Sequence, residues 1–395
     1  MGAADRSASS HAPLGRQSSA VISGEPSDTS QDAVVLLVHY DPDTRSAGQC
    51  TGTLLAPRLV LTARHCVADT DPNAACTAEG DSLAGGEIRR NRKASTLYVF
   101  TGQDRPDFHG EIEADGEGMK ILDNGGENLC NNDIALLVLK EPVKNAKIAP
   151  IRLDTDVEKG ELITAVGWGV TEKTPQPAVR MQRTGVQITG VGPDEDAMPP
   201  VPSKEFEVGE SICSGDSGGP AFAEATGAVI GVVSRGGNNT RPDETDPSAT
   251  CIEGNNLYTK VSAFKDLILQ AYELAEQEPW LEGQPDPRKA KVGEACTEAS
   301  DCRSDLCAAE PSSADGATTC AAPCTEDSEC TGEGEKCLAA GDVFACRVPK
   351  PLPPRRASGG FCTYAPAEPS ASGAGAALIA AAAVLLSASR RRRRR

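Results

Sequence analysis

The chain has 395 residues, more than one ordinary domain contains, which suggests two or three units. It carries 39 basic and 57 acidic residues, for a net charge of −18. A nucleic-acid partner is not expected, because binding nucleic acid depends on neutralising its phosphates and an acidic surface repels them. Arg390 to Arg395 form one run, and removing these six charges leaves −24 on the rest of the chain.

Residues 1–20 form a polar leader rich in Ser, Ala and Gly. Met1 to Gln17 contains no apolar stretch of the kind a signal peptide needs. The cysteines described below indicate export, so either the natural start lies upstream of Met1, which we favour, or the protein is exported by an unusual route.

The segment 21–275 is predicted to be one β-rich domain. Turn-forming Gly, Pro, Asn and Asp separate its short apolar runs, which indicates a barrel or a sandwich. Helical spacing occurs only in Ala263–Glu276, so we expect a helix that closes the domain. The expected strands are Val34–Val38, Leu59–Ala63, Leu97–Phe100, Ile134–Leu139, Ile163–Gly167, Val186–Val191, Ala228–Ser234 and Leu257–Val261.

The chain contains 15 cysteines in two groups and one remainder. Six precede residue 260, eight lie between Cys296 and Cys346, and Cys362 stands alone. Zinc binding is the alternative, but zinc sites favour paired C-x2-C knuckles or histidines, and no histidine follows His109. Disulfides in an oxidising compartment are therefore the better interpretation.

Behind a linker at 276–291, residues 292–348 form a cysteine-rich module with an imperfect internal repeat. Four bridges are expected to hold it, because its core is too small to be stable alone. It is a spacer or a partner-binding module, and the absence of an aromatic or basic patch favours the spacer. A Pro/Gly/Ser-rich linker at 349–372, an apolar segment at 373–389 and the basic tail 390–395 follow. The apolar segment is short for a transmembrane span, but the arginines would stop transfer and stay cytoplasmic.

The candidate nucleophile is Ser217, in the run Cys213-Ser214-Gly215-Asp216-Ser217-Gly218-Gly219-Pro220. Gly215-x-Ser217-x-Gly219 also fits the nucleophile elbow of α/β-hydrolases. That alternative requires a histidine after the serine, but all four histidines precede Ser217. The α/β-hydrolase fold is thus excluded.

A general base and a buried acid are needed to activate a serine. His65 follows an apolar run and precedes Cys66, whereas His11 lies in the leader, His39 ends a strand and His109 lies in an acidic loop. Asp133 opens the run Ile134–Leu139, where a strand end would bury its carboxylate. We expect His65 and Asp133 to act with Ser217.

Together these segments resemble the trypsin/chymotrypsin family of serine proteases. Leu61-Thr62-Ala63-Arg64-His65-Cys66 resembles its histidine box, Asp133-Ile134-Ala135-Leu136-Leu137 its aspartate box, and Gly215 to Pro220 matches its serine box. The resemblance implies an all-β fold of two packed six-stranded antiparallel barrels with a C-terminal helix, and a His65–Asp133–Ser217 triad. It also implies an oxyanion hole made by the backbone amides of Gly215 and Ser217, with no cofactor or metal.

The same resemblance implies the disulfides Cys50–Cys66 and Cys213–Cys251. Cys76 and Cys130 then remain, and we expect them to bond as well. Val21-Ile22-Ser23-Gly24 resembles a mature N-terminus, which implies cleavage after Ala20 and pairing of the new ammonium with Asp216. A simple strand start at Val21 is the alternative.

Substrate selection is expected to involve Ser211, Ser234, Gly236 and Asn256. Ser211 stands where trypsin-like enzymes carry an aspartate, so a substrate cation would be uncompensated. Asn256 would shorten the cavity and Gly236 would leave its mouth open. We therefore expect cleavage after uncharged, small to medium residues; Arg235, where an aromatic residue is common, departs from the family pattern.

The C-terminal region resembles the sorting tails of myxobacterial surface proteins, with Gly359-Gly360-Phe361-Cys362 before the span and the arginines. Cys362 is then a processing or lipid-attachment site; a plain membrane anchor is the alternative. We expect a monomeric protease, secreted or displayed at the cell surface, that acts on proteins or peptides. A catalytically inactive homologue that serves as a surface binding protein is the second hypothesis.

Overall fold

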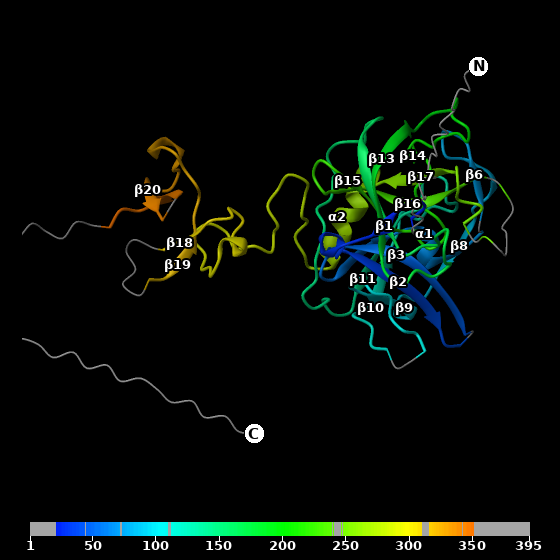
Figure 1. Ribbon diagram of the computed structural model, residues 1–395, viewed down its shortest axis with the longest axis horizontal. Coiled ribbons are helices and arrows are strands. Elements are labelled where there is room, and N and C mark those ends of the chain that lie inside the picture. Colours follow the sequence, from blue (N-terminus) through cyan, green and yellow to red (C-terminus); the bar gives the residue numbers. More distant parts are fainter. Residues whose placement is uncertain are drawn as a thin grey trace, which may run out of the picture. The chain divides into compact units, whose positions relative to one another are not determined.

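The computed structural model describes residues 21–350, apart from 44, 72, 110–111, 239, 241–245, 247, 310–315 and 342. All described helices and strands belong to one compact unit that ends at Pro349 (Figure 1). The leader 1–20, Cys362, the apolar segment 373–389 and the tail 390–395 lie outside the described residues. Within the described part of the chain, no helix has the length and apolar character needed to cross a membrane.

The first half of the domain is a closed six-stranded antiparallel barrel with the order β10-β11-β4-β3-β2-β9. Its strands show little alternation of apolar and polar residues, because several of them are buried on both faces. All five residues of β11, for example, are buried. The strands are β2 (Val34–Asp41), β3 (Ser46–Ala56), β4 (Leu59–Thr62), β9 (Leu97–Phe100), β10 (Gly116–Leu122) and β11 (Ala135–Leu139).

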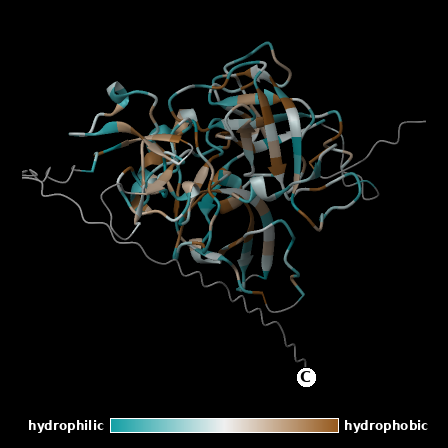
Figure 2. Ribbon diagram, turned by 60° about the vertical axis from the view of Figure 1, so that its left-hand side comes forward, coloured by the Kyte–Doolittle hydropathy of each residue, from teal (hydrophilic) through white to brown (hydrophobic). Residues whose placement is uncertain are grey.

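The second half is a seven-stranded sheet with the order β1-β13-β12-β15-β16-β17-β14, and the pairing of β13 with β14 closes six of its strands into a second barrel. Phe206 stacks on Tyr258 in its core, with ring centroids 5.3 Å apart. The strands are β1 (Glu25–Pro26), β12 (Leu162–Gly167), β13 (Met181–Val191), β14 (Glu205–Val208), β15 (Pro220–Ala223), β16 (Val229–Gly237) and β17 (Asn255–Lys260). The all-β prediction of two six-stranded barrels is confirmed, and Figure 2 shows apolar residues concentrated in the barrel strands.

The predicted closing helix is present as α2 (Lys265–Leu274), after a 3-10 turn η3 (Ser262–Phe264). It buries Ile268, Ala271 and Tyr272 on one face, and the Tyr272 hydroxyl donates to the carbonyl of Leu55 at 3.2 Å. The helix is shorter than predicted because the chain first forms the 3-10 turn and then reaches the left-handed region at Glu276, where φ is +58°.

Between His65 and Asp133, outside the barrel strands β9 and β10, the chain forms an insertion whose strands were not predicted from the sequence. Two antiparallel strand pairs build it, one nested inside the other along the sequence, and a disulfide joins Cys76 to Cys130. The elements between β4 and β9 are α1 (Arg64–Val67), β5 (Ala68–Thr70), β6 (Ala74–Cys76), β7 (Ser82–Gly85), β8 (Ile88–Asn91) and η2 (Ala94–Thr96). A further 3-10 turn, η1 (Thr29–Gln31), lies before the first barrel.

The cysteine-rich module contains the four predicted bridges. Each half uses the same connectivity, first cysteine to third and second to fourth: Cys296–Cys307 and Cys302–Cys320, then Cys324–Cys337 and Cys330–Cys346. Its elements are η4 (Ala299–Asp301), β18 (Cys307–Ala309), β19 (Thr318–Cys320), η5 (Asp327–Glu329), β20 (Lys336–Ala340) and β21 (Val343–Arg347).

The predicted linker at 276–291 makes specific contacts with the barrel domain. The amide of Ile151 donates to the carbonyl of Trp280 at 2.9 Å, and Ile151 bridges with Leu281. Arg152 pairs with Glu282 at 2.6 Å between Nε and Oε2. The first part of the linker is therefore packed, because its apolar and acidic side chains have partners on the domain.

Arg180, just before β13, connects the second barrel to the N-terminal segment and to the first barrel. Its guanidinium is completely buried and each of its nitrogens donates a hydrogen bond. The acceptors, at 2.8–3.2 Å, are Ser27 Oγ, the Asp28, Val34 and Gly102 carbonyls and Asp32 Oδ1.

We predict that Arg180→Ala lowers the free energy of unfolding by about 3 kcal/mol, because it leaves several buried acceptors without a donor. Lys265→Ala is the control, since Lys265 is half exposed and makes a surface pair with Asp154, whose loss costs about 0.5 kcal/mol or less. Denaturant unfolding of both variants measures the difference, and equal effects would contradict the bridging role of Arg180.

Candidate active site

Asp133 is a fully buried charged group where the two barrels meet. Its side chain has no exposed surface, and it lies just before β11. Asp133 Oδ2 lies 2.8 Å from His65 Nδ1 and accepts from Ser234 Oγ at 2.6 Å, while Oδ1 accepts from the backbone amide of His65 at 3.0 Å. Burial opposes ionisation of Asp133, but His65 and these hydrogen bonds outweigh it and hold its pKa below the ordinary value.

His65 is held by α1, which starts directly after strand β4. The disulfide between Cys50 of β3 and Cys66 fixes the backbone beside it. Burial lowers the pKa of His65, and the Asp133 carboxylate more than offsets this, so that the pKa lies above its ordinary value. The Asp133 contact also orients the ring, because it engages Nδ1 and leaves Nε2 for another partner.

Ser217 lies in a tight loop that only glycines allow. Gly215 and Gly218 have φ values of +102° and +81°, and a Cβ on Gly218 would meet Thr62 Oγ1 at 2.1 Å. Within the described part of the chain, the backbone amides of Gly215 and Ser217 donate no hydrogen bond. These two amides are therefore available to an acceptor that enters the site.

Ser217 and His65 line one cavity of about 510 Å³. Ser234, Gly236 and Asn256 also line it, as expected from the sequence. Part of the wall was not expected from the sequence, because residues of the insertion line it too: Thr70, Asp71, Asn73, Ala74 and Leu129. A smaller cavity of about 220 Å³ lies on the other side of the same two residues and includes His39 and Arg92.

Ser211 differs from expectation, because it does not line the cavity. It is fully buried, and Asn256 Nδ2 lies 3.4 Å from its hydroxyl. Asn256 is also almost fully buried and donates through Nδ2 to the carbonyl of Gly209 at 2.9 Å. Its Oδ1 has no hydrogen-bond partner among the described residues and lies 2.1 Å from the position that a Cβ on Gly236 would take.

Asp216 is buried beneath the serine loop without a salt-bridge partner among the described residues. It accepts from the amides of Gly169 and Cys213 at 2.7 and 2.9 Å. Burial raises its pKa to about 7, although these hydrogen bonds and Arg105 oppose the shift. Val21 and Ile22 are buried in the second half of the domain, but Val21 is not among the partners of Asp216.

The structure contains all three disulfides expected in the barrel domain: Cys50–Cys66, Cys76–Cys130 and Cys213–Cys251. The groups of close metal-ligand side chains in the described part of the chain consist of bonded cysteines, joined in one case by His65. A cysteine sulfur in a disulfide is a poor metal ligand, so these groups do not indicate a metal site.

Comparison with known proteins identifies the class. A sequence model of the family described as Trypsin matches residues 22–268. A trypsin of Saccharopolyspora erythraea is 25% identical over 257 residues, which cover 63% of this chain and 97% of the relative. Phenoloxidase-activating factor 3 of Holotrichia diomphalia is 28% identical, over 63% of this chain and 72% of the relative. Glucanase inhibitor protein 2 of Phytophthora infestans is 28% identical, over 47% and 81%.

Because the family model spans more than half of the chain, the protein belongs to the trypsin family. It is a serine endopeptidase. The resemblance noted in the sequence is confirmed for the barrel domain.

Asp216 predicts a specific pH dependence of stability. Since its pKa rises from 3.8 to about 7 on folding, the folded chain keeps a proton that the unfolded chain releases. The contribution of this proton to the free energy of unfolding, on the order of 4 kcal/mol, is present at low pH and is lost as the pH rises from about 4 to 7. Asp216→Asn, in the uncleaved chain carrying Ser217→Ala, is therefore expected to flatten the fall in unfolding free energy over this range.

Urea unfolding at several pH values measures this effect. Asp196→Asn is the control, because Asp196 is exposed. An unchanged pH slope in Asp216→Asn would show that Asp216 is not the titrating group.

Proposed function

We propose that His65, Asp133 and Ser217 form the catalytic triad of this endopeptidase. The observation that carries the proposal is the contact of 2.8 Å between His65 Nδ1 and the buried Asp133, together with the cavity that His65 and Ser217 both line. A histidine held in this way exposes Nε2 as a base towards the serine hydroxyl.

In the proposed reaction, Ser217 Oγ attacks the carbonyl carbon of a peptide bond while His65 takes its proton. The carbonyl oxygen becomes an oxyanion, and the free amides of Gly215 and Ser217 donate to it; one such donor contributes about 3 kcal/mol. His65 then gives the proton to the leaving amine, and water hydrolyses the acyl-enzyme. Asp133 stays ionised and stabilises the imidazolium.

We further propose that cleavage after Ala20 activates the protein as a zymogen. A new ammonium at Val21 would give the buried Asp216 a cation and so remove the cost of its desolvated charge. The high pKa of Asp216 in the uncleaved chain supports this, because the carboxyl lacks such a partner. A small residue before the cut, Ala20, fits self-cleavage.

The proposed substrates have a neutral residue before the scissile bond. Asn256 supports this in place of Ser211, because the residue lines the cavity with an uncharged side chain whose Oδ1 has no hydrogen-bond partner among the described residues. Asn256 Nδ2 donates to the carbonyl of Gly209, so turning the amide by 180° would place Oδ1 against that carbonyl oxygen. A side chain that is small, or that donates a hydrogen bond without a charge, fits such a pocket.

We propose secretion and display at the cell surface as the setting, with the protein acting as a monomer. Seven disulfides support an oxidising compartment. Anchoring through 373–389 and processing at Cys362 follow from the sequence pattern alone. We propose a protease domain at 21–275, a linker at 276–291 and a cysteine-rich module at 292–348.

Labelling with a fluorophosphonate tests the triad. The probe is expected to label the processed wild-type protein, with a Val21 N-terminus and formed disulfides, because it reacts with an activated serine. Ser217→Ala and His65→Ala are expected to remove the label. Absence of label from the wild type would favour the second hypothesis, a binding protein, and the name of the Phytophthora relative shows that this family includes an inhibitor.

Asn256→Asp tests the pocket. The change preserves shape and adds one negative charge, so we predict that the preferred residue before the cut becomes Lys or Arg. Profiling a peptide library with wild type and variant measures this. A wild-type preference for Lys or Arg, or an unchanged profile in Asn256→Asp, would contradict the assignment of Asn256.

A further inference from the structure

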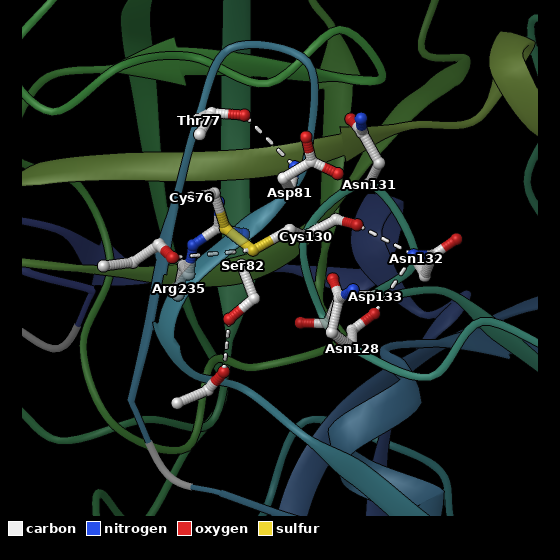
Figure 3. The surroundings of a disulfide bond; sticks show 12 residues. Cys76, Thr77, Asp81, Ser82, Asn128, Cys130, Asn131, Asn132, Asp133 and Arg235 are labelled. Carbon is white, nitrogen blue, oxygen red and sulfur yellow. Dashed lines mark hydrogen bonds between the residues drawn. A yellow bond between two sulfur atoms is a disulfide. The ribbon is translucent and has the colours of Figure 1, made fainter.

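Arg235 of β16 directs its side chain away from solvent, into the space behind the candidate triad. Figure 3 shows it pointing toward the Cys76–Cys130 disulfide, where Nη2 lies 3.2 Å from Cys76 Sγ. Its side chain is only 17% exposed. A guanidinium in such a place needs a counterion and acceptors.

The counterion is Glu205 of β14, whose side chain has no exposed surface. Arg235 Nη2 lies 2.6 Å from Oε2, and Nη1 donates to Oε1 at 3.0 Å. Glu205 Oε1 also accepts from the amide of Asn131 at 2.9 Å, two residues before Asp133. Glu205 thus joins Arg235 to the backbone that carries Asp133.

Arg235 also reaches the candidate triad through a hydroxyl. Its Nη1 donates to Ser234 Oγ at 3.2 Å, and Ser234 Oγ donates to Asp133 Oδ2 at 2.6 Å. A guanidinium can only donate, so the Ser234 hydroxyl accepts from Arg235 and its single proton is donated to Asp133. A charged donor strengthens such a chain of hydrogen bonds.

We propose that Arg235 is a positioning residue for the triad, which acts through Ser234 on Asp133 and is itself held by the buried Glu205. The inference rests on the proposed catalytic function. From the sequence alone, Arg235 was notable only because it stands where an aromatic residue is common. Its guanidinium is committed to Glu205 and Ser234, which argues against a role as a free cation for acidic substrates.

The network has an electrostatic consequence for His65. The charged groups around His65 in the described part of the chain are Asp133, Arg235 with Glu205, Asp71 across the main cavity, and His39 and Arg92 across the smaller one. Arg235 opposes the upward pKa shift that Asp133 causes at His65. Burial raises the pKa of Glu205, and Arg235 opposes that shift too, so the charge on Glu205 depends on its partner.

Two variants with opposite expected effects test the proposal. Arg235→Met keeps much of the side-chain volume and removes the cation, so the acidic limb of kcat/KM against pH is expected to shift to higher pH. We also expect kcat to fall roughly tenfold, the effect of one charge-assisted hydrogen bond. Glu205→Gln keeps the shape and leaves the cation uncompensated, so the limb is expected to shift to lower pH.

The measurements use the processed full chain, with active sites counted by fluorophosphonate titration and folding checked by thermal unfolding. Limbs that stay in place, or that move in the same direction in both variants, would overturn the positioning role, because a merely structural role changes the amount of active enzyme and not its pH profile. If Arg235→Met does not fold, the near-isosteric Glu205→Gln decides alone. An unlabelled wild type would overturn the proposed triad itself, whereas a labelled wild type with unshifted limbs would overturn only this inference.

Discussion

The carboxylate of Asp133 is removed from water, and the arrangement of the site follows from the need to stabilise its charge. Every oxygen of that group has donors: the His65 ring and amide, and the Ser234 hydroxyl. These donors come from α1 and β16, which belong to different barrels. The two halves of the domain must therefore dock in one geometry for the charge to be satisfied, and that geometry brings Ser217 and His65 to a common cavity.

A second buried charged group, the ion pair of Arg235 and Glu205, lies behind the Asp133 carboxylate. Arg235 and Glu205 compensate each other, and the insertion closes over them with the Cys76–Cys130 bridge. The insertion also supplies one wall of the cavity, including Asp71 and Asn73. The same inserted segment thus supports the buried ion pair on one side and faces an incoming peptide on the other.

The barrels, the disulfides and the residues around Ser217 were predictable because each leaves a local pattern. His65 and Asp133 stand beside apolar strands, and the glycines around Ser217 mark a loop that other residues cannot form. The position of Ser211 was not predictable, because the Asn256 side chain that covers it comes from a distant strand. Glu205 offered a weak signal, a carboxylate opening the buried run Glu205–Val208, but its partner Arg235 is set by tertiary packing. The helix prediction was too long because a 3-10 turn and an αL residue are decided by local geometry.

The module after the barrels has a consequence for the lifetime of the protein. Its bridges span only 11 to 18 residues each, and the chain between them folds back in two-stranded ribbons. A protease of this family must draw several residues of its substrate into an extended conformation, and a cross-linked ribbon does not yield such a stretch without local unfolding. We therefore expect the cross-linked ribbons of this module to resist autolysis by the enzyme that precedes them in the chain.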